Sequence, residues 1–174
     1  MKSFVSSKVL SILLVIMIAM VALVPMMTRA ATTSQVVVTV HPLFISISNS
    51  PSIYEFSGFV GENTTPTTTA NYFTIANYSS VAIDISIAAT NFTGGIGWTL
   101  ASNATPGSMI AGMYAGIVSG TFDTVIKTSP GNALKTNLAA SENQTWHLQL
   151  MAPTVYADGV TKESTITVSA AATT

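Results

Sequence analysis

Apolar and polar residues alternate with a period of two through most of the chain after residue 30. In 81–90 every second residue is Val, Ile or Ala, and the residues between them are small or polar. Because successive side chains of a strand point to opposite faces, this run predicts a strand with one buried face. Alternation or β-branched content predicts further strands at 36–40, 43–48, 54–60, 73–77, 146–150 and 165–169.

Clusters of turn-forming residues separate these runs, at 49–51, 62–69, 91–95, 103–107, 129–132 and 158–159. About eight to ten short strands at such spacing are typical of an all-β protein. The predicted fold class is therefore all-β, an antiparallel jelly roll or β-sandwich. Asp158-Gly159 has the composition of a two-residue hairpin turn, and we expect such a turn there.

The segment 109–120, MIAGMYAGIVSG, departs from this pattern because Gly112, Gly116 and Gly120 recur at every fourth residue. That spacing would line one face of a helix, and in a longer apolar stretch it is typical of packed transmembrane helices. About a dozen residues cannot cross a bilayer. We expect a short helix or a glycine-rich strand packed on the sandwich.

The N-terminus has the layout of a secretory signal peptide. Two lysines precede the apolar run 9–24, and Thr28 and Ala30 occupy the small positions before an expected cleavage at Ala31. The alternative is a retained membrane anchor, since the run is slightly shorter than the roughly 20 residues that span a bilayer. The expected organisation is a signal peptide at 1–30, an N-terminal strand at 31–42 and a β-sandwich domain at 43–174.

The composition excludes several classes of function. Only 7% of the residues are charged, with six basic residues against seven acidic ones. Nucleic-acid binding needs a surplus of Lys and Arg, so nucleic acid is not expected as a partner. The chain has no cysteine, which excludes disulfides, thiolate zinc sites and cysteine nucleophiles. We expect a secreted, extracellular protein that meets the membrane only through its signal peptide.

Residues for acid–base or metal chemistry are sparse. The two histidines, His41 and His147, are far apart in the sequence. We expect His147 on the polar surface of a strand and His41 at the end of one. The chain has no HExxH zinc helix, no GxSxG elbow and no phosphate-binding loop. The prediction is a protein without catalytic residues, metal or cofactor.

The acceptor sequence for N-linked glycans, Asn-x-Ser/Thr, recurs along the chain. Its five occurrences are Asn63, Asn77, Asn91, Asn103 and Asn143. Asn63, Asn91 and Asn103 fall in predicted loops, where a bulky glycan is most easily accommodated. Glycans would also supply the hydration that so few charges cannot provide.

The strand at the start of the mature chain indicates a structural function. It consists of Gln35, Val36, Val37, Val38, Thr39 and Val40, with no charge and no proline. A free edge strand of this kind recruits another chain. If each subunit donates this strand into the next, backbone hydrogen bonds and alternating apolar side chains hold it, and the product is an open head-to-tail filament. The expected partner is a second copy of the same chain.

The order and style of four segments of the chain match a known pattern. These segments are the signal peptide, the early VVVTV strand, the stretch 71–100 and the late stretch 145–170. In these features the chain resembles the TasA/camelysin-type biofilm fibre proteins and their archaeal relatives, the bundling pilins. The resemblance implies a secreted jelly-roll subunit, joined by donor-strand complementation into fibres that bundle in a biofilm matrix. It implies that 35–40 is the donor strand, and it does not locate the acceptor.

Two other functions remain open. A monomeric cell-surface β-sandwich could bind carbohydrate by stacking it on an aromatic ring. Trp98, after a glycine-rich turn, is the candidate platform, whereas Trp146 alternates with Leu148 and Leu150 and is expected in the core. An envelope or surface-layer component would differ from a filament mainly in its lattice geometry.

Overall fold

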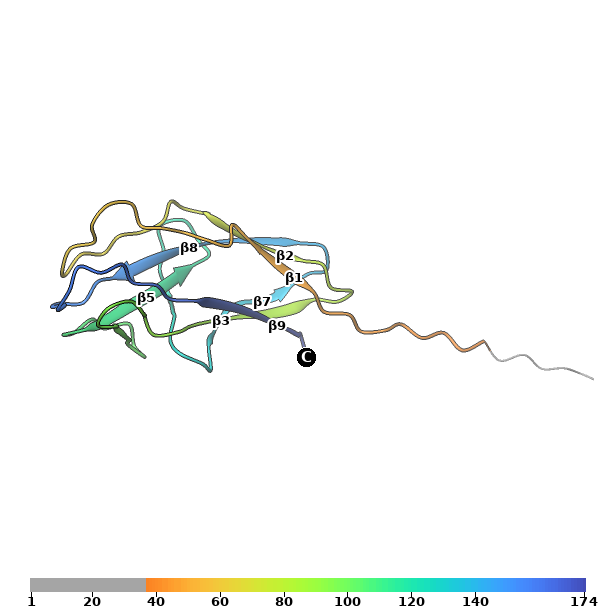
Figure 1. Ribbon diagram of the computed structural model, residues 1–174. Helices are drawn as coiled ribbons and strands as arrows, with labels where there is room; N and C mark the ends of the chain where they lie inside the picture. Colours follow the sequence, from red (N-terminus) through yellow and green to blue (C-terminus); the bar gives the residue numbers. More distant parts are fainter. Residues whose placement is uncertain (1–36) are drawn as a thin grey trace, which may run out of the picture. The chain divides into compact units, whose positions relative to one another are not determined.

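The computed structural model describes residues 37–174, and the chain divides into two units after Val40. The unit His41–Thr174 contains all the strands of the described residues (Figure 1). The predicted signal peptide at 1–30 lies outside the described residues. Gln35 and Val36 of the predicted donor strand lie outside them too.

Every regular secondary-structure element among residues 37–174 is a β-strand. In chain order they are β1 (Ile47–Ser50), β2 (Phe73–Asn77), β3 (Ile83–Ala89), β4 (Thr99–Leu100), β5 (Ile110–Gly116), β6 (Thr124–Val125), β7 (Asn132–Leu138), β8 (Asn143–Met151) and β9 (Ile166–Ala172). The prediction of an all-β protein is confirmed.

The strands form two sheets that share one hydrophobic core. The larger sheet has the order β1-β2-β8-β5-β4, and β6 pairs with β5 at Tyr114 and Ala115. The smaller sheet has the order β7-β3-β9. In Figure 1, β2 and β8 lie above β3, β7 and β9. The short pair of β4 and β5 is parallel, so the larger sheet is mixed and not purely antiparallel as predicted. The arrangement is β-sandwich-like.

The core is built by the alternation that the sequence predicts. Every second residue of β2 and of β3 is buried. The large side chains that β2, β3, β5 and β8 bury are Phe73, Ile75, Ile83, Ile85, Ile87, Met113, Trp146, Leu148 and Leu150. Full burial of one such side chain stabilises the fold by roughly 1.5–3 kcal/mol. These apolar rows hold the two sheets together.

The glycine-rich segment is a strand, β5, and not a helix. Residues four apart lie on the same face of a strand, so Gly112 and Gly116 share the face opposite the core. A Cβ atom at Gly112 would lie 2.1 Å from the carbonyl oxygen of Ala104, and one at Gly116 would lie 1.7 Å from that of Thr121. The glycines therefore allow two loops to lie directly on the outer face of the sheet.

Several predicted elements differ from the structure. Residues 37–40 of the strand expected at 36–40 are in no strand, and the strand expected at 43–48 coincides with β1 only at residues 47–48. The strand expected at 54–60 belongs to neither sheet. The hairpin turn expected at Asp158-Gly159 is also wrong, because no strand borders it and the nearest bridges are at Val155 and Glu163. The carboxylate of Asp158 accepts hydrogen bonds from the backbone N–H groups of Ile96 and Val160. Asp158 therefore serves to connect two loops.

Candidate functional site

The described part of the predicted donor strand is exposed and unpaired. The exposed fractions of Val37, Val38 and Val40 are 86%, 78% and 76%. None of the residues 37–40 belongs to a strand. Valine is among the residues most often found inside proteins, so this segment is a strand-forming sequence without a sheet.

The free edge of β1 and the residues that follow β1 also lack strand partners. β1 pairs with β2 on one edge, and no strand of the described residues pairs with its other edge. After β1, no backbone group of 52–59 makes a hydrogen bond within residues 37–174. Side chains in this run still alternate, because Tyr54 and Phe56 pack against the core whereas Ile53 and Glu55 are exposed. Residues 54–56 therefore keep the alternation that the sequence predicts, but 54–60 forms no strand and the chain bends at Gly58, where φ is 81°.

A second free edge belongs to β9. This strand pairs with β3 along its whole length, from Ile166 opposite Ala89 to Ala172 opposite Ile83, and with no other strand of residues 37–174. Its core-facing residues pack against the hydrophobic cluster but stay half-buried, whereas those of the central strand β3 are fully buried. The core is therefore less completely covered along β9 than elsewhere in the smaller sheet.

The position of this edge in the fold was not visible in the sequence. The alternation at 165–169 predicts a strand, but it does not predict which strands are its neighbours. The carbonyl of Ala82 accepts a hydrogen bond from Thr173, and the carbonyl of Ser46 accepts one from Tyr78. Since residues 78 and 82 are close in the chain, the end of β9 and the start of β1 lie at the same end of the folded unit.

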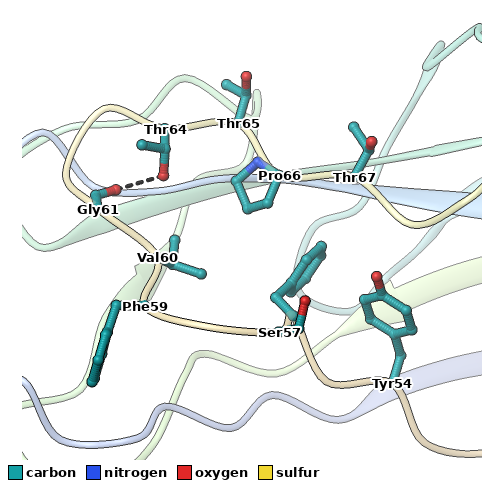
Figure 2. Close-up of a pocket in the computed structure, with 10 residues that line it drawn as sticks. Tyr54, Ser57, Phe59, Val60, Gly61, Thr64, Thr65, Pro66 and Thr67 are labelled. Atoms are coloured by element: carbon teal, nitrogen blue, oxygen red, sulfur yellow. Dashed lines mark hydrogen bonds between the residues drawn. The ribbon is translucent and has the colours of Figure 1, made fainter.

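A shallow pocket of about 390 Å³ lies between the loop 54–61 and the segment 64–67 (Figure 2). Tyr54, Phe56 and Val60 line it together with three threonines. The hydroxyl of Thr64 donates to the carbonyl of Gly61 at 2.6 Å and closes the turn at one end. No carboxylate, imidazole or amine lines the pocket. Its walls offer aromatic surface and hydroxyl groups.

Four of the five candidate glycan acceptors are accessible. Asn63, Asn91, Asn103 and Asn143 are exposed. Their side-chain nitrogens, the atoms that carry an N-linked glycan, make no hydrogen bond within the described residues. Asn63, Asn91 and Asn103 lie in loops, as the sequence predicts, and Asn143 begins β8.

Asn77 differs from the other four acceptors because it is only 1% exposed. Its side-chain nitrogen donates to the carbonyl oxygens of Leu138 and Ala139 at 3.0 and 2.9 Å. Its side-chain oxygen accepts from the backbone N–H of Ser79. A glycan on this nitrogen would break these bonds, so the structure removes Asn77 from the candidate acceptors.

The prediction of a surface position for His147 is wrong. Its side chain is on the face of β8 opposite Trp146, but it is 1% exposed because the loop 117–122 folds over that face. The imidazole Nε2 lies 3.0 Å from the carbonyl oxygen of Thr121, and the ring of Phe122 packs edge-on at 4.8 Å. His41, in contrast, is exposed. The structure does not bring the two histidines together.

Both tryptophans are buried. Trp98 is 6% exposed and packs between Phe92 and Tyr156, with ring centroids 5.6 and 5.5 Å away. It therefore offers no accessible face for stacking a sugar. Trp146 is 1% exposed and stacks on Phe73 in the core, as its alternation with leucines predicts.

An ion pair holds the loops beside Trp98. Lys162 pairs with the carboxylate of Asp158 and also donates to the carbonyl of Gly94 at 2.6 Å. The hydrogen bond from Lys162, reinforced by the backbone N–H of Ile96, lowers the pKa of Asp158 below its ordinary value. The hydrogen bonds of Lys162 to Gly94 and of Ile96 to Asp158 join the loop 94–96 to the chain that leads into β9.

Within residues 37–174, no group of three or more His, Cys, Asp or Glu side chains is arranged to hold a metal ion. The same part of the chain contains no helix long and apolar enough to cross a membrane. In comparisons with known proteins, no family model matches this chain and no curated protein is significantly similar to it.

Proposed function

We propose that this protein is the secreted subunit of an extracellular filament, such as a pilus or a biofilm-matrix fibre. In this proposal each subunit is a jelly roll that donates its N-terminal strand, 35–40, to the next copy. Repetition of the same contact gives a head-to-tail homopolymer. The filament needs no cofactor and no catalytic residue.

The observation that carries the proposal is the coexistence of an unpaired donor and unpaired sheet edges. Val37, Val38 and Val40 are exposed and in no strand. The free edges of β1 and β9, together with the unbonded run 52–59, offer backbone groups that a further strand would satisfy. An unpaired edge of this kind is avoided in monomeric proteins because it recruits other chains.

The expected energy of the contact is large enough to hold a filament. In an extended strand Val36, Val38 and Val40 project to one side, and Val37 and Thr39 project to the other. Burial of each valine contributes roughly 1.5–3 kcal/mol, and each new backbone hydrogen bond adds a net of about 0.5–1.5 kcal/mol. One apolar row of the donor therefore supplies most of the stabilisation.

A charge in that row tests the proposal. Val38→Asp, and separately deletion of 31–40, should stop filament growth while the protein is still secreted and folded, as judged by electron microscopy of extracellular material. Thr39→Asp is the matched control, because it places the same charge on the opposite row, and filaments should still form. A synthetic peptide of residues 34–40 should raise the melting temperature of the truncated subunit.

Two results would contradict the proposal. One is filament growth by the protein that lacks 31–40. The other is an intact protein that stays monomeric at high concentration with 36–40 paired in its own sheet. Either result would make 36–40 an ordinary strand and would favour a monomeric cell-surface binding module.

A further inference from the structure

The backbone hydrogen bonds at both ends of β9 identify which of its residues face β3. Thr90 donates its N–H to the carbonyl of Thr165, and Thr173 donates to the carbonyl of Ala82. Hydrogen-bonded and non-hydrogen-bonded pairs alternate along an antiparallel ladder. Because Thr165 and Thr173 are in hydrogen-bonded pairs, the residues of β9 in the alternate pairs of the observed register point their N–H and C=O groups away from β3. These residues are Ile166, Val168, Ala170 and Ala172.

The same four residues carry the side chains that face the core. They are half-buried, whereas the three residues between them are exposed. Ile166, Val168 and Ala170 already pack against the hydrophobic cluster. A strand added at this edge would pair with the free backbone groups and cover the half-buried row at the same time, as in other cases of strand addition.

The other edge of the smaller sheet is protected against strand addition. β7 carries Lys135, and its register with β3 shifts at Ile85. Asn137 has a left-handed backbone, with φ of 54°, and its N–H donates to the carboxylate of Asp84. A charge and an irregular register both discourage the pairing of a further chain. β7 also contacts β6 and β8.

The edge strands of the larger sheet are shorter than β9 and offer fewer free backbone groups to an added strand. β4 and β6 each span only 2 residues. β1 spans 4 residues, and its Asn49 side chain is already hydrogen-bonded to the indole of Trp146. β9 spans 7 residues, in a regular register with β3 and with no charged residue or proline. Among the described residues it is the longest regular free edge.

We infer that the free edge of β9 receives the segment 35–40 of a second copy of this chain. This inference rests on the proposed function, since it names the surface that accepts the donor strand. The donor matches the edge in length and in its lack of charge, and its described residues are exposed and in no strand. None of the exposed glycan acceptors lies on β9, so glycosylation would leave this edge open.

Disulfide trapping tests the inference, because the chain has no cysteine of its own. Val38→Cys is combined in turn with Ile166→Cys, Val168→Cys or Ala170→Cys in the full-length secreted protein, so that each donor register is sampled. After oxidation, at least one pair should give a ladder of covalent multimers on a non-reducing denaturing gel, and reduction should collapse it. Val38→Cys with Thr136→Cys, on the β7 edge, is the control and should give no ladder.

The outcomes separate this inference from the proposed function. If filaments form but no β9 pair cross-links, or if the β7 pair cross-links equally well, the acceptor is elsewhere and the filament proposal survives. A cross-linked monomer without a ladder would show insertion within one chain, which overturns the inference. If the protein lacking 31–40 still polymerises, the proposed function itself fails.

A proline substitution gives a second, independent measurement. The N–H of Val168 points away from β3, so Val168→Pro removes no bond within the subunit, a position at which an edge strand tolerates proline. Ile47→Pro is the matched control, because the N–H of Ile47 also points to a free edge, that of β1. Provided that both variants stay folded by circular dichroism, Val168→Pro should lower the filament yield at least tenfold and Ile47→Pro should not. Equal yields would contradict the inference.

Discussion

The indole N–H of Trp146 in β8 donates a hydrogen bond to the side-chain oxygen of Asn49 in β1, at 2.9 Å. The bond crosses β2, which lies between the two strands in the sheet. Trp146 is also stacked on Phe73 of β2, with ring centroids 4.3 Å apart. One buried side chain thus connects three neighbouring strands and holds the edge strand β1 in place.

Replacement of Asn49 by Ala should destabilise the fold. The substitution leaves the buried N–H of Trp146 without its acceptor, and an unsatisfied buried polar group costs about 1–3 kcal/mol. Urea unfolding followed by tryptophan fluorescence measures the loss. Asn143→Ala, at an exposed position, is the control and should change the free energy of unfolding little. Equal effects would show that the bond contributes nothing specific.

Gly116 should not tolerate a side chain. A Cβ atom there would lie 1.7 Å from the carbonyl oxygen of Thr121 and 2.8 Å from Nε2 of His147. Gly116→Ala therefore forces the loop 117–122 off the sheet, and we expect a loss of about 1–3 kcal/mol, typical of overpacking. Gly159→Ala is the matched control, because nothing lies within 4 Å of its Cβ position. Thermal melting of the two variants distinguishes them, and a neutral Gly116→Ala would contradict the tight packing over His147.

Glycans should be confined to the exposed acceptors. In protein purified from its native source, peptides containing Asn63, Asn91, Asn103 or Asn143 should carry additional mass, and the Asn77 peptide should not. The reason is the burial of Asn77 and the use of its side-chain nitrogen in hydrogen bonds. Peptide mass spectrometry measures this directly. A modified Asn77, or five unmodified acceptors, would contradict the prediction.

The ion pair between Asp158 and Lys162 should make stability depend on pH in the acidic range. The folded-state pKa of Asp158 is lowered by the hydrogen bond from Lys162 and by that from Ile96. The stabilisation is therefore fully present above the unfolded-state pKa and is lost as the pH falls through the folded-state value. The difference in melting temperature between the wild type and Asp158→Asn should be largest near neutral pH and should shrink in acid. Asp123→Asn, at an exposed acid outside this ion pair, should show no such trend.

Local sequence patterns located the four strands β2, β3, β8 and β9 because one face of each is apolar, whereas β4, β6 and β7 were not predicted. The predicted run 73–77 coincides with β2, and the run 81–90 contains β3. The segment 109–120 could not be assigned, since a spacing of four places glycines on one face of a helix and of a strand alike. His147 lies on the face of β8 that the alternation predicts to be exposed. It is buried because the loop 117–122, which is distant from it in the sequence, covers that face. Asn77 alternates with Phe73 and Ile75, so the pattern places it on the buried face of β2, but the pattern does not show that its amide is bonded to Leu138 and Ala139.

The sequence by itself determined that the chain is a β protein, which faces of its central strands are apolar, and that 36–40 is an uncharged, valine-rich segment. These properties depend on the residue types and on the two-residue period of a strand, both of which are local. Only the tertiary structure decided which strands are neighbours, and therefore that β9 is a free edge, that 52–59 has no partner and that β5 is covered by loops. Pairing depends on contacts between segments far apart in the chain, and an alternating run has the same local pattern whether its edges are occupied or free.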